Sequence, residues 1–234
     1  MNIVFTRPLI ETEDSMTKFF SSGYKVIHVP TLSISSANME PLNLTKYDAL
    51  IFTSANAVRF LKIKDNNKSI KCFCVGNLTE RALRLKGFSN TISASGTVNA
   101  LKNIIINSEK KIKNLAYLCG DIISIDLDKE LISEGFKVRK IINYTSTKIS
   151  ELNSEIINLL KKYPANFVLI YSKRSAESFD DIIRKYSLSE LMTQSTVMCI
   201  SKKIEEFLKS KGWNKIEIFS PGDELIKIDQ IKNG

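Results

Sequence analysis

Short apolar runs rich in β-branched residues alternate along the chain with amphipathic stretches, each of roughly ten to fifteen residues. The runs that we predict to be strands are Asn2–Thr6, Tyr24–Val29, Ala49–Thr53, Lys71–Val75, Asn90–Ser93, Leu115–Cys119, Lys137–Tyr144, Asn166–Tyr171, Thr196–Ile200 and Lys215–Phe219. Alternation of strand and helix is typical of βαβ units with mostly parallel sheets. The pattern therefore predicts an α/β fold of the flavodoxin-like or Rossmann-like kind, with helices flanking the sheets.

The first and second halves of the chain also align with each other, in four blocks that keep their order. LRLKGFSNTISAS matches FLKSKGWNKIEIFS, with glycines 125 positions apart (212 − 87), and KCFCVGNLTERAL matches VMCISKKIEEFL at the same offset. A third match joins YDALIFTSANAVRFL to NFVLIYSKRSAESF, with serines 118 positions apart (172 − 54). The fourth joins IVFTRP and the strand after it to AYLCGD and the strand after that, with glycines 112 positions apart (135 − 23). The sequence therefore predicts two similar lobes.

Two segments lack any clear hydrophobic period. Thr31–Lys46 carries Pro41 and several Ser and Asn residues, and Thr145–Ser150 is short and polar. We interpret both as linkers, so that the chain crosses twice between the lobes. Any small-molecule site is then expected in the cleft between them.

Composition and charge narrow the class of protein. Hydrophobic residues make up 43% of the 234 residues, no apolar run is long enough to span a membrane, and the N-terminus contains no signal-peptide core. We expect a cytoplasmic protein that does not bind membranes. The net charge of +9 (34 − 25) suits an anionic partner, but the lysines are scattered and lack the interleaved aromatic residues of a nucleic-acid surface.

The sequence offers few groups for cofactor or covalent chemistry. Its four cysteines, Cys72, Cys74, Cys119 and Cys199, fall in strand-like runs and are expected to be plain buried thiols, and His28 is the only histidine. GxGxxG, GxxxxGK[ST] and GxSxG motifs do not occur. We predict no metal and no cofactor, which leaves hydrogen bonding, positioning and electrostatics as the means of any catalysis.

Hydroxyl and basic side chains directly follow the predicted strands, where ligands bind in open parallel sheets. The candidates are Arg7, Thr53, Ser54, Asn56, Thr79, Tyr144, Ser172, Lys202 and Lys203. Each has an ordinary explanation as well, since Ser, Thr and Asn at such junctions commonly cap helices and a tyrosine there commonly packs. Together they favour a carboxylate or phosphate ligand.

These strand-end blocks resemble the uroporphyrinogen-III synthase family. The matching stretches are IVFTRP, YDALIFTSANAVRFL, CVGNLTERALRLKGF, EGFKVRKIINYTS, FVLIYSKRSAESF and CISKKIEEFLKSKGW, in the family's order and over almost the whole chain. The resemblance implies one lobe at about 1–32 and 148–234, a second at 38–143, and a two-stranded linker at 33–37 and 144–147. It also implies a monomer.

The resemblance further implies a hydro-lyase that needs no cofactor. Its small-molecule substrate would be hydroxymethylbilane, a linear tetrapyrrole polycarboxylate, which loses water and closes to uroporphyrinogen III with inversion of the last ring. By the same resemblance Tyr144 would assist the departing hydroxyl, and Arg7, Ser54, Thr79 and Ser172 would contact the substrate. Lys202 and Lys203 stand where relatives carry small residues, and we expect them to bind substrate carboxylates.

Two alternatives remain open. The chain could be a two-lobed intracellular protein that binds a small polyanion without catalysis, as hinge proteins do. The net charge alone also allows a nucleic-acid-associated accessory protein, whose affinity would fall steeply with salt.

Overall fold

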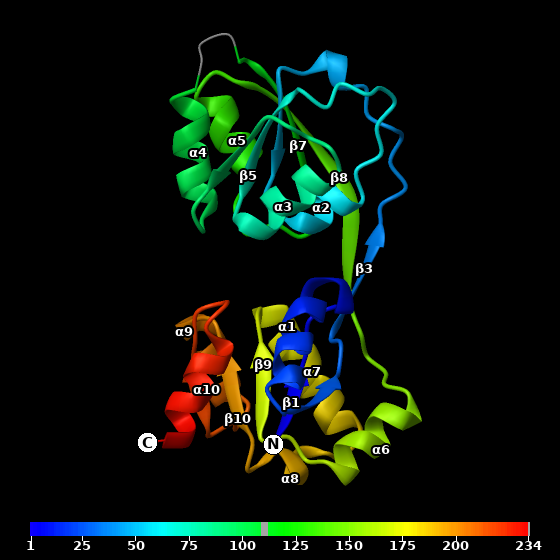
Figure 1. Cartoon of the computed structure of the whole chain (residues 1–234), viewed down its shortest axis with the longest axis vertical. Coiled ribbons are helices and arrows are strands. Elements are labelled where there is room, and N and C mark those ends of the chain that lie inside the picture. The colour runs from blue at the N-terminus through cyan, green and yellow to red at the C-terminus, as the bar shows by residue number, and fades with distance from the viewer. Residues whose placement is uncertain (109–111, 234) are drawn as a thin grey trace. The chain divides into compact units, whose positions relative to one another are not determined.

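A computed structural model describes residues 1–108 and 112–233 of the chain. It divides into two compact units. The terminal unit comprises Met1–Ser33 and Thr147–Gly234 and contains both ends of the chain, and the inserted unit comprises Ile34–Ser146. Figure 1 shows each unit as a sheet covered by helices.

The terminal unit is built on a five-stranded sheet in the order β11-β10-β9-β1-β2, and all its strand pairs are parallel. Its strands are β1 (Asn2–Phe5), β2 (Lys25–His28), β9 (Phe167–Ile170), β10 (Thr196–Cys199) and β11 (Ile216–Ile218). Its helices are α1 (Leu9–Ser21), α6 (Ser154–Lys162), α7 (Lys173–Lys185), α8 (Ser189–Met192), α9 (Lys202–Ser210) and α10 (Glu224–Asn233). One face packs against α6, α7, α8 and α9, and the other against α1 and α10.

The inserted unit is built on a six-stranded sheet in the order β3-β8-β7-β4-β5-β6. Its strands are β3 (Leu32–Ser36), β4 (Ala49–Phe52), β5 (Lys71–Val75), β6 (Thr91–Ala94), β7 (Asn114–Gly120) and β8 (Lys137–Lys148). Its helices are α2 (Ala55–Arg59), α3 (Asn77–Leu85), α4 (Val98–Ile106) and α5 (Leu127–Ser133), with a 3₁₀ turn η1 (Leu44–Lys46). Helices α2 and α3 cover one face of the sheet, and α4 and α5 cover the other.

Burial on both faces explains why the central strands are continuous apolar runs. All four residues of β4 (ALIF) and all four of β9 (FVLI) are buried. Parallel strands between two helical layers have no solvent face, so they do not alternate polar with apolar residues.

The two sheets have the same pairing register. Ile3 of β1 pairs with Phe167 of β9, and the positions that match them in the internal alignment, Leu115 and Ala49, pair with each other in the inserted unit. The pairs of β9 with β10, of β10 with β11 and of β1 with β2 likewise correspond to those of β4 with β5, of β5 with β6 and of β7 with β8. The predicted fold, an α/β protein of two similar lobes, is confirmed.

All ten predicted strands are present, with bounds shifted by a few residues, and Thr31–Lys46, which we interpreted as a linker, contains regular structure that the hydrophobic period did not predict. That segment contains β3 and η1, and β8 continues to Lys148 through residues that we had assigned to the second linker. The sequence of β3, LSISS, does alternate, with Leu32 and Ile34 partly buried and the serines exposed. The alternation covers only five positions, so it did not stand out from the polar residues that follow it.

Within the described residues, no helix is both long enough and apolar enough to cross a membrane.

Candidate active site

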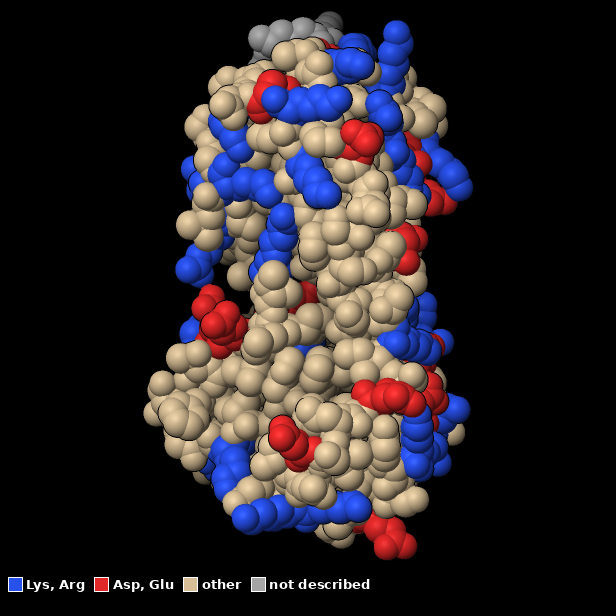
Figure 2. Space-filling model, turned by 90° about the vertical axis from the view of Figure 1, so that its right-hand side faces the viewer, with Lys and Arg blue, Asp and Glu red and all other residues tan. Residues whose placement is uncertain are grey.

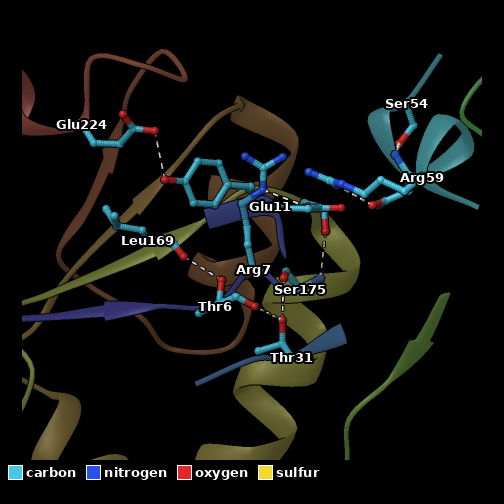
Figure 3. A network of polar contacts seen from close by, with 12 residues as sticks. Thr6, Arg7, Glu11, Thr31, Ser54, Arg59, Leu169, Ser175 and Glu224 are labelled. Atoms are coloured by element: carbon cyan, nitrogen blue, oxygen red, sulfur yellow. Dashed lines mark hydrogen bonds and ion pairs between the residues drawn. The ribbon is translucent and has the colours of Figure 1, made fainter. Parts of the chain in front are cut away.

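Buried hydroxyl groups tie together the strand ends of the terminal unit. The Thr6 hydroxyl donates to the Leu169 carbonyl at 2.6 Å, so that it joins the ends of β1 and β9. Thr31 lies 3.0 Å from the Thr6 carbonyl and 2.5 Å from the Ser175 hydroxyl on α7. Thr6, Thr31 and Ser175 are at most 2% exposed. These groups fix the edge at which the more exposed candidates stand (Figure 3).

Arg7 follows directly after β1 and is about one-third exposed. Its Nε lies 3.2 Å from Oε2 of Glu11, and its guanidinium carbon is 4.5 Å from the centre of the Tyr171 ring. The Tyr171 hydroxyl donates to Glu224 at 2.9 Å, and burial, with Glu224 next, raises the pKa of this phenol. Tyr171 therefore stays protonated, and its ring supports a cation that remains open to solvent on one side.

Ser172 and Ser54 occupy equivalent positions in the two units, and each caps the helix that follows it. The Ser172 oxygen accepts a hydrogen bond from the Ser175 amide at 3.0 Å and caps α7, while the Ser54 oxygen accepts from the Asn56 amide at 3.1 Å and caps α2. A serine that accepts at a helix N-terminus still has its own O–H to donate. Both serines therefore cap helices, and the hydroxyl proton of each can still be donated to a ligand.

The remaining candidates at the end of β4 are more enclosed. Asn56 is 3% exposed, and its Oδ1 accepts from Nη1 of Arg59 at 2.8 Å. The Thr53 hydroxyl lies 3.2 Å from the hydroxyl of Tyr117, a residue of β7 that is 1% exposed. After the neighbouring strand β5, Thr79 lies in the first turn of α3 and is 4% exposed.

Tyr144 stands on β8, beside the end of β7. The register between the two strands shifts between Cys119 and Gly120, and Gly120 is paired with Tyr144. The ring is partly buried against the core of the inserted unit and stacks on Phe60, with centroids 6.3 Å apart and planes inclined by 26°. The Asp121 amide donates to the Tyr144 carbonyl at 3.1 Å. The backbone and one face of the ring are therefore fixed by packing.

Lys202 and Lys203 begin α9, and both are exposed. Among the described residues neither makes an ion pair. Ser201, at the N-cap position, makes no capping contact with its side chain. Two cations without a described ion pair thus stand at the carboxyl edge of the terminal sheet, exposed to solvent.

The candidates gather at two edges. Arg7, Ser172 and the two lysines follow β1, β9 and β10, which are neighbours in the terminal sheet. Thr53, Ser54, Asn56 and Thr79 follow β4 and β5 at the corresponding edge of the inserted sheet, and Tyr144, within β8, pairs with the last residue of β7 there. Across the face drawn in Figure 2, Lys and Arg are spread over both units among Asp and Glu, without the continuous basic stripe of a nucleic-acid surface.

The buried polar residues that were absent from our candidates include Thr31, Asn143, Ser175 and Tyr117. Asn143 is fully buried, and its Nδ2 donates to the Ala57 carbonyl at 2.7 Å. The internal alignment contained the signal, because the offsets of 112 and 118 pair Thr31 with Asn143 and Ser175 with Ala57.

The cysteines carry no chemistry here. All four are free and buried, as expected. Burial raises the pKa of the Cys72 thiol to about 12 and that of Cys119 to about 11, so both stay protonated and unreactive. In the described part of the chain no group of three or more His, Cys, Asp and Glu could hold a metal ion.

Two parallel α/β sheets with hydroxyl and basic groups at the carboxyl ends of their strands define an α/β protein of the class whose ligands bind beyond the strand ends. The family model of uroporphyrinogen-III synthase HemD matches residues 14–219. The chain belongs to this family. The predicted function, uroporphyrinogen-III synthase, and its lyase class are confirmed on this ground, and the substrate is a small molecule.

Two solved structures share the fold. The uroporphyrinogen-III synthetase of Helicobacter pylori 26695 is 18% identical, with a TM-score of 0.66 over 100% of this chain and 99% of that chain. A mutant uroporphyrinogen III synthase of the extremely thermophilic bacterium Thermus thermophilus is 14% identical, with a TM-score of 0.55 over 100% of both chains. No curated protein matches the sequence significantly.

Proposed function

We propose that this chain converts hydroxymethylbilane to uroporphyrinogen III with loss of one water, and that the candidates at the two sheet edges bind and orient the substrate. Membership of the family over residues 14–219 is the observation that carries the proposal. The remaining support is chemical, since hydroxyl donors and cations are the groups that a polycarboxylate requires.

The carboxylates would be bound by two kinds of donor. Ser54 and Ser172 each accept one backbone amide and so can direct their own O–H to a carboxylate oxygen. Arg7, Lys202 and Lys203 add positive charge at the edge of the terminal sheet. Asn56 and Thr79 are buried and Thr53 is partly buried, and they would act from the floor of the site on the inserted unit.

Tyr144 would assist departure of the substrate hydroxyl. A phenol with an ordinary pKa near 10 is protonated at neutral pH and can donate a hydrogen bond or a proton to a leaving oxygen. General acid assistance of this kind is worth about 10²–10⁴-fold in rate. The stacked contact with Phe60 orients the ring for this task.

We also propose that the protein acts as a monomer in the cytoplasm. Its free, buried thiols suit a reducing compartment.

The decisive experiment supplies hydroxymethylbilane to the purified protein, oxidises the products and measures the ratio of porphyrin isomers. The type III isomer is expected in excess over a control without enzyme and over heat-denatured protein. Prior dialysis against a chelator should leave the ratio unchanged. Type I product alone, at the rate of the control, would show that the assignment is wrong.

A further inference from the structure

Gly120, the last residue of β7, differs from the other glycines that the structure describes. Seven of these eight glycines have a positive φ and open space where a Cβ would stand. Gly120 has neither a positive φ nor the space, and it is buried. The backbone conformation at Gly120 is one that alanine can adopt. Only the lack of space for a Cβ therefore requires glycine at this position.

The obstacle is the ring of Tyr144. A Cβ on Gly120 would lie 2.7 Å from both Cε2 and Cζ of Tyr144 and 3.0 Å from its hydroxyl oxygen. Carbon atoms in contact are normally about 3.5–4.0 Å apart. The hydroxyl end of the tyrosine therefore lies directly over the bare Cα of Gly120, and a methyl group there would displace that end by roughly 1 Å.

The rest of Tyr144 cannot retreat to make room. Its carbonyl accepts the Asp121 amide at 3.1 Å, and the register shift beside Cys119 pairs it with Gly120. On the ring side, Phe60 stacks at 6.3 Å. With the strand fixed and one ring face covered, the ring can only rotate away from Gly120, which moves the hydroxyl most.

The terminal unit has no such pair. The offset of 112 places Pro8 opposite Gly120 and Leu32 opposite Tyr144. The glycine and the tyrosine therefore occur together in the inserted unit, and the equivalent positions of the terminal unit have neither.

We propose that Gly120 is a positioning residue, whose missing side chain sets the place of the Tyr144 hydroxyl over the end of β7. What that hydroxyl does there rests on the proposed function. Where the ring lies does not, and this allows the two ideas to be tested separately.

The kinetic test uses Gly120→Ala in the full chain. A displacement of about 1 Å at a reacting group costs up to about 100-fold, so we expect kcat to fall by about 10- to 100-fold with KM changed less than about threefold. In a Tyr144→Phe background the same Gly120→Ala change should lower kcat by less than about threefold, because the hydroxyl that it displaces is already gone. Equal losses in both backgrounds would overturn the proposal.

A stability test keeps the proposal falsifiable if Gly120→Ala folds poorly or shows no activity. Gly120→Ala should lower Tm by several degrees when Tyr144 is present. In Tyr144→Ala protein the methyl group has room, so the further drop in Tm should vanish. A drop in Tm of the same size in both backgrounds would show that the added methyl group clashes with something other than the Tyr144 ring.

The two failures can be told apart. If the wild-type protein forms no type III product, the proposed function is wrong, and the Tm cycle still decides where the ring lies. If the wild-type protein forms type III product and Gly120→Ala turns over at full rate, the positioning role is wrong and the proposed function stands.

Discussion

The terminal unit and the inserted unit share one strand order and one pairing register, yet neither is a continuous repeat of the sequence. The internal alignment runs from β1, β2, β4, β5 and β6 to β7, β8, β9, β10 and β11. The terminal unit contains β1 and β2 of the first repeat with the last three strands of the second, and the inserted unit contains the complementary set. The two repeats have thus exchanged segments within one chain, as domain-swapped subunits do between chains.

Once the units are aligned, the polar contacts at their edges can be compared position by position. In the terminal unit Thr31 contacts the hydroxyl of Ser175. At the equivalent place in the inserted unit Asn143 donates to the carbonyl of Ala57. Thr31 follows β2 and Asn143 lies on β8, and each is fastened to the first turn of the helix after the neighbouring third strand, α7 after β9 and α2 after β4. The scaffold requires a hydrogen bond at this point but does not require a particular pair of side chains.

Tyr117 and Tyr171, one in each unit, lie at positions that are not equivalent. Tyr117 of the inserted unit matches Phe5, while Tyr171 of the terminal unit matches Thr53. Tyr117 bonds to Thr53 within its own sheet, whereas Tyr171 turns to Glu224 at the start of α10. The comparison teaches that the two edges share a framework and carry different chemistry, with the candidate acid Tyr144 on only one of them.

The largest effect is expected where the buried hydrogen bond of the inserted unit is broken with a charge. In Asn143→Asp a carboxyl group would face the Ala57 carbonyl, and the free energy of unfolding at pH 7 should fall by about 3 kcal/mol or more. Burial holds the pKa of this carboxyl above its ordinary value of about 3.9, so the stability relative to wild type is highest at low pH. It is then lost at about 1.4 kcal/mol per pH unit as pH rises. Urea unfolding at pH 4.5 and pH 7 measures this.

Thr31→Val, at the equivalent position, is the control. It removes a buried hydroxyl without adding charge, so it should cost about 1 kcal/mol at both pH values. Asn143→Asp protein whose stability, relative to wild type, does not change with pH would show that water reaches this site.

The next effect concerns Tyr117, whose equivalent is Phe5. Burial raises the pKa of Tyr117 to about 12, whereas a tyrosine in the unfolded chain titrates near 10. Its contribution to stability is therefore complete below about pH 10 and is lost at up to about 1.4 kcal/mol per pH unit between there and pH 12. Tyr117→Phe should remove this part of the alkaline decline. Identical pH curves for the two proteins would contradict the burial of this hydroxyl.

Tyr144→Phe tests the difference in chemistry. It removes the hydroxyl and keeps the stack on Phe60, so stability should change by less than about 1 kcal/mol. Turnover should fall tenfold or more, a change of at least about 1.4 kcal/mol in the barrier, while substrate binding stays close to that of wild type. Tyr163→Phe, on the terminal unit, is the control and should turn over normally. Full turnover by the Tyr144 variant would show that this tyrosine only packs.

The smallest effect is expected at the start of α9. Replacing Lys202 and Lys203 together with alanine should raise KM by a few fold at low salt and flatten its salt dependence, because exposed charges contribute under about 1 kcal/mol each. Lys209 lies on the same helix but pairs with Glu205, and Lys209→Ala should leave KM unchanged. An unchanged KM in the double variant would assign both lysines to the surface.

The sequence predicted the strands far better than the contacts at their ends. β4 and β9 are fully buried apolar runs, so their composition alone indicates them. Thr31 was placed in a linker because its segment lacks a clear hydrophobic period, and its contact with Ser175, 144 positions away, leaves no local pattern in the sequence. Hydrophobic period and spacing also did not assign strands to sheets, since the repeats are continuous in the chain and the units are not, and only the family resemblance implied such a division.

The exchange of segments has a consequence for how the protein emerges from the ribosome. β1 ends at Phe5 and must pair with β9, which begins at Phe167, so 162 positions (167 − 5) are synthesised in between. At about 5–20 residues per second this takes roughly 8–30 s. During this time the inserted unit, which is one continuous stretch of chain, can complete its sheet. β1 and β2 meanwhile lack the strand β9 beside them, so their apolar residues remain exposed. The segment of β1 and β2 is therefore the one that we expect a ribosome-associated chaperone to shield.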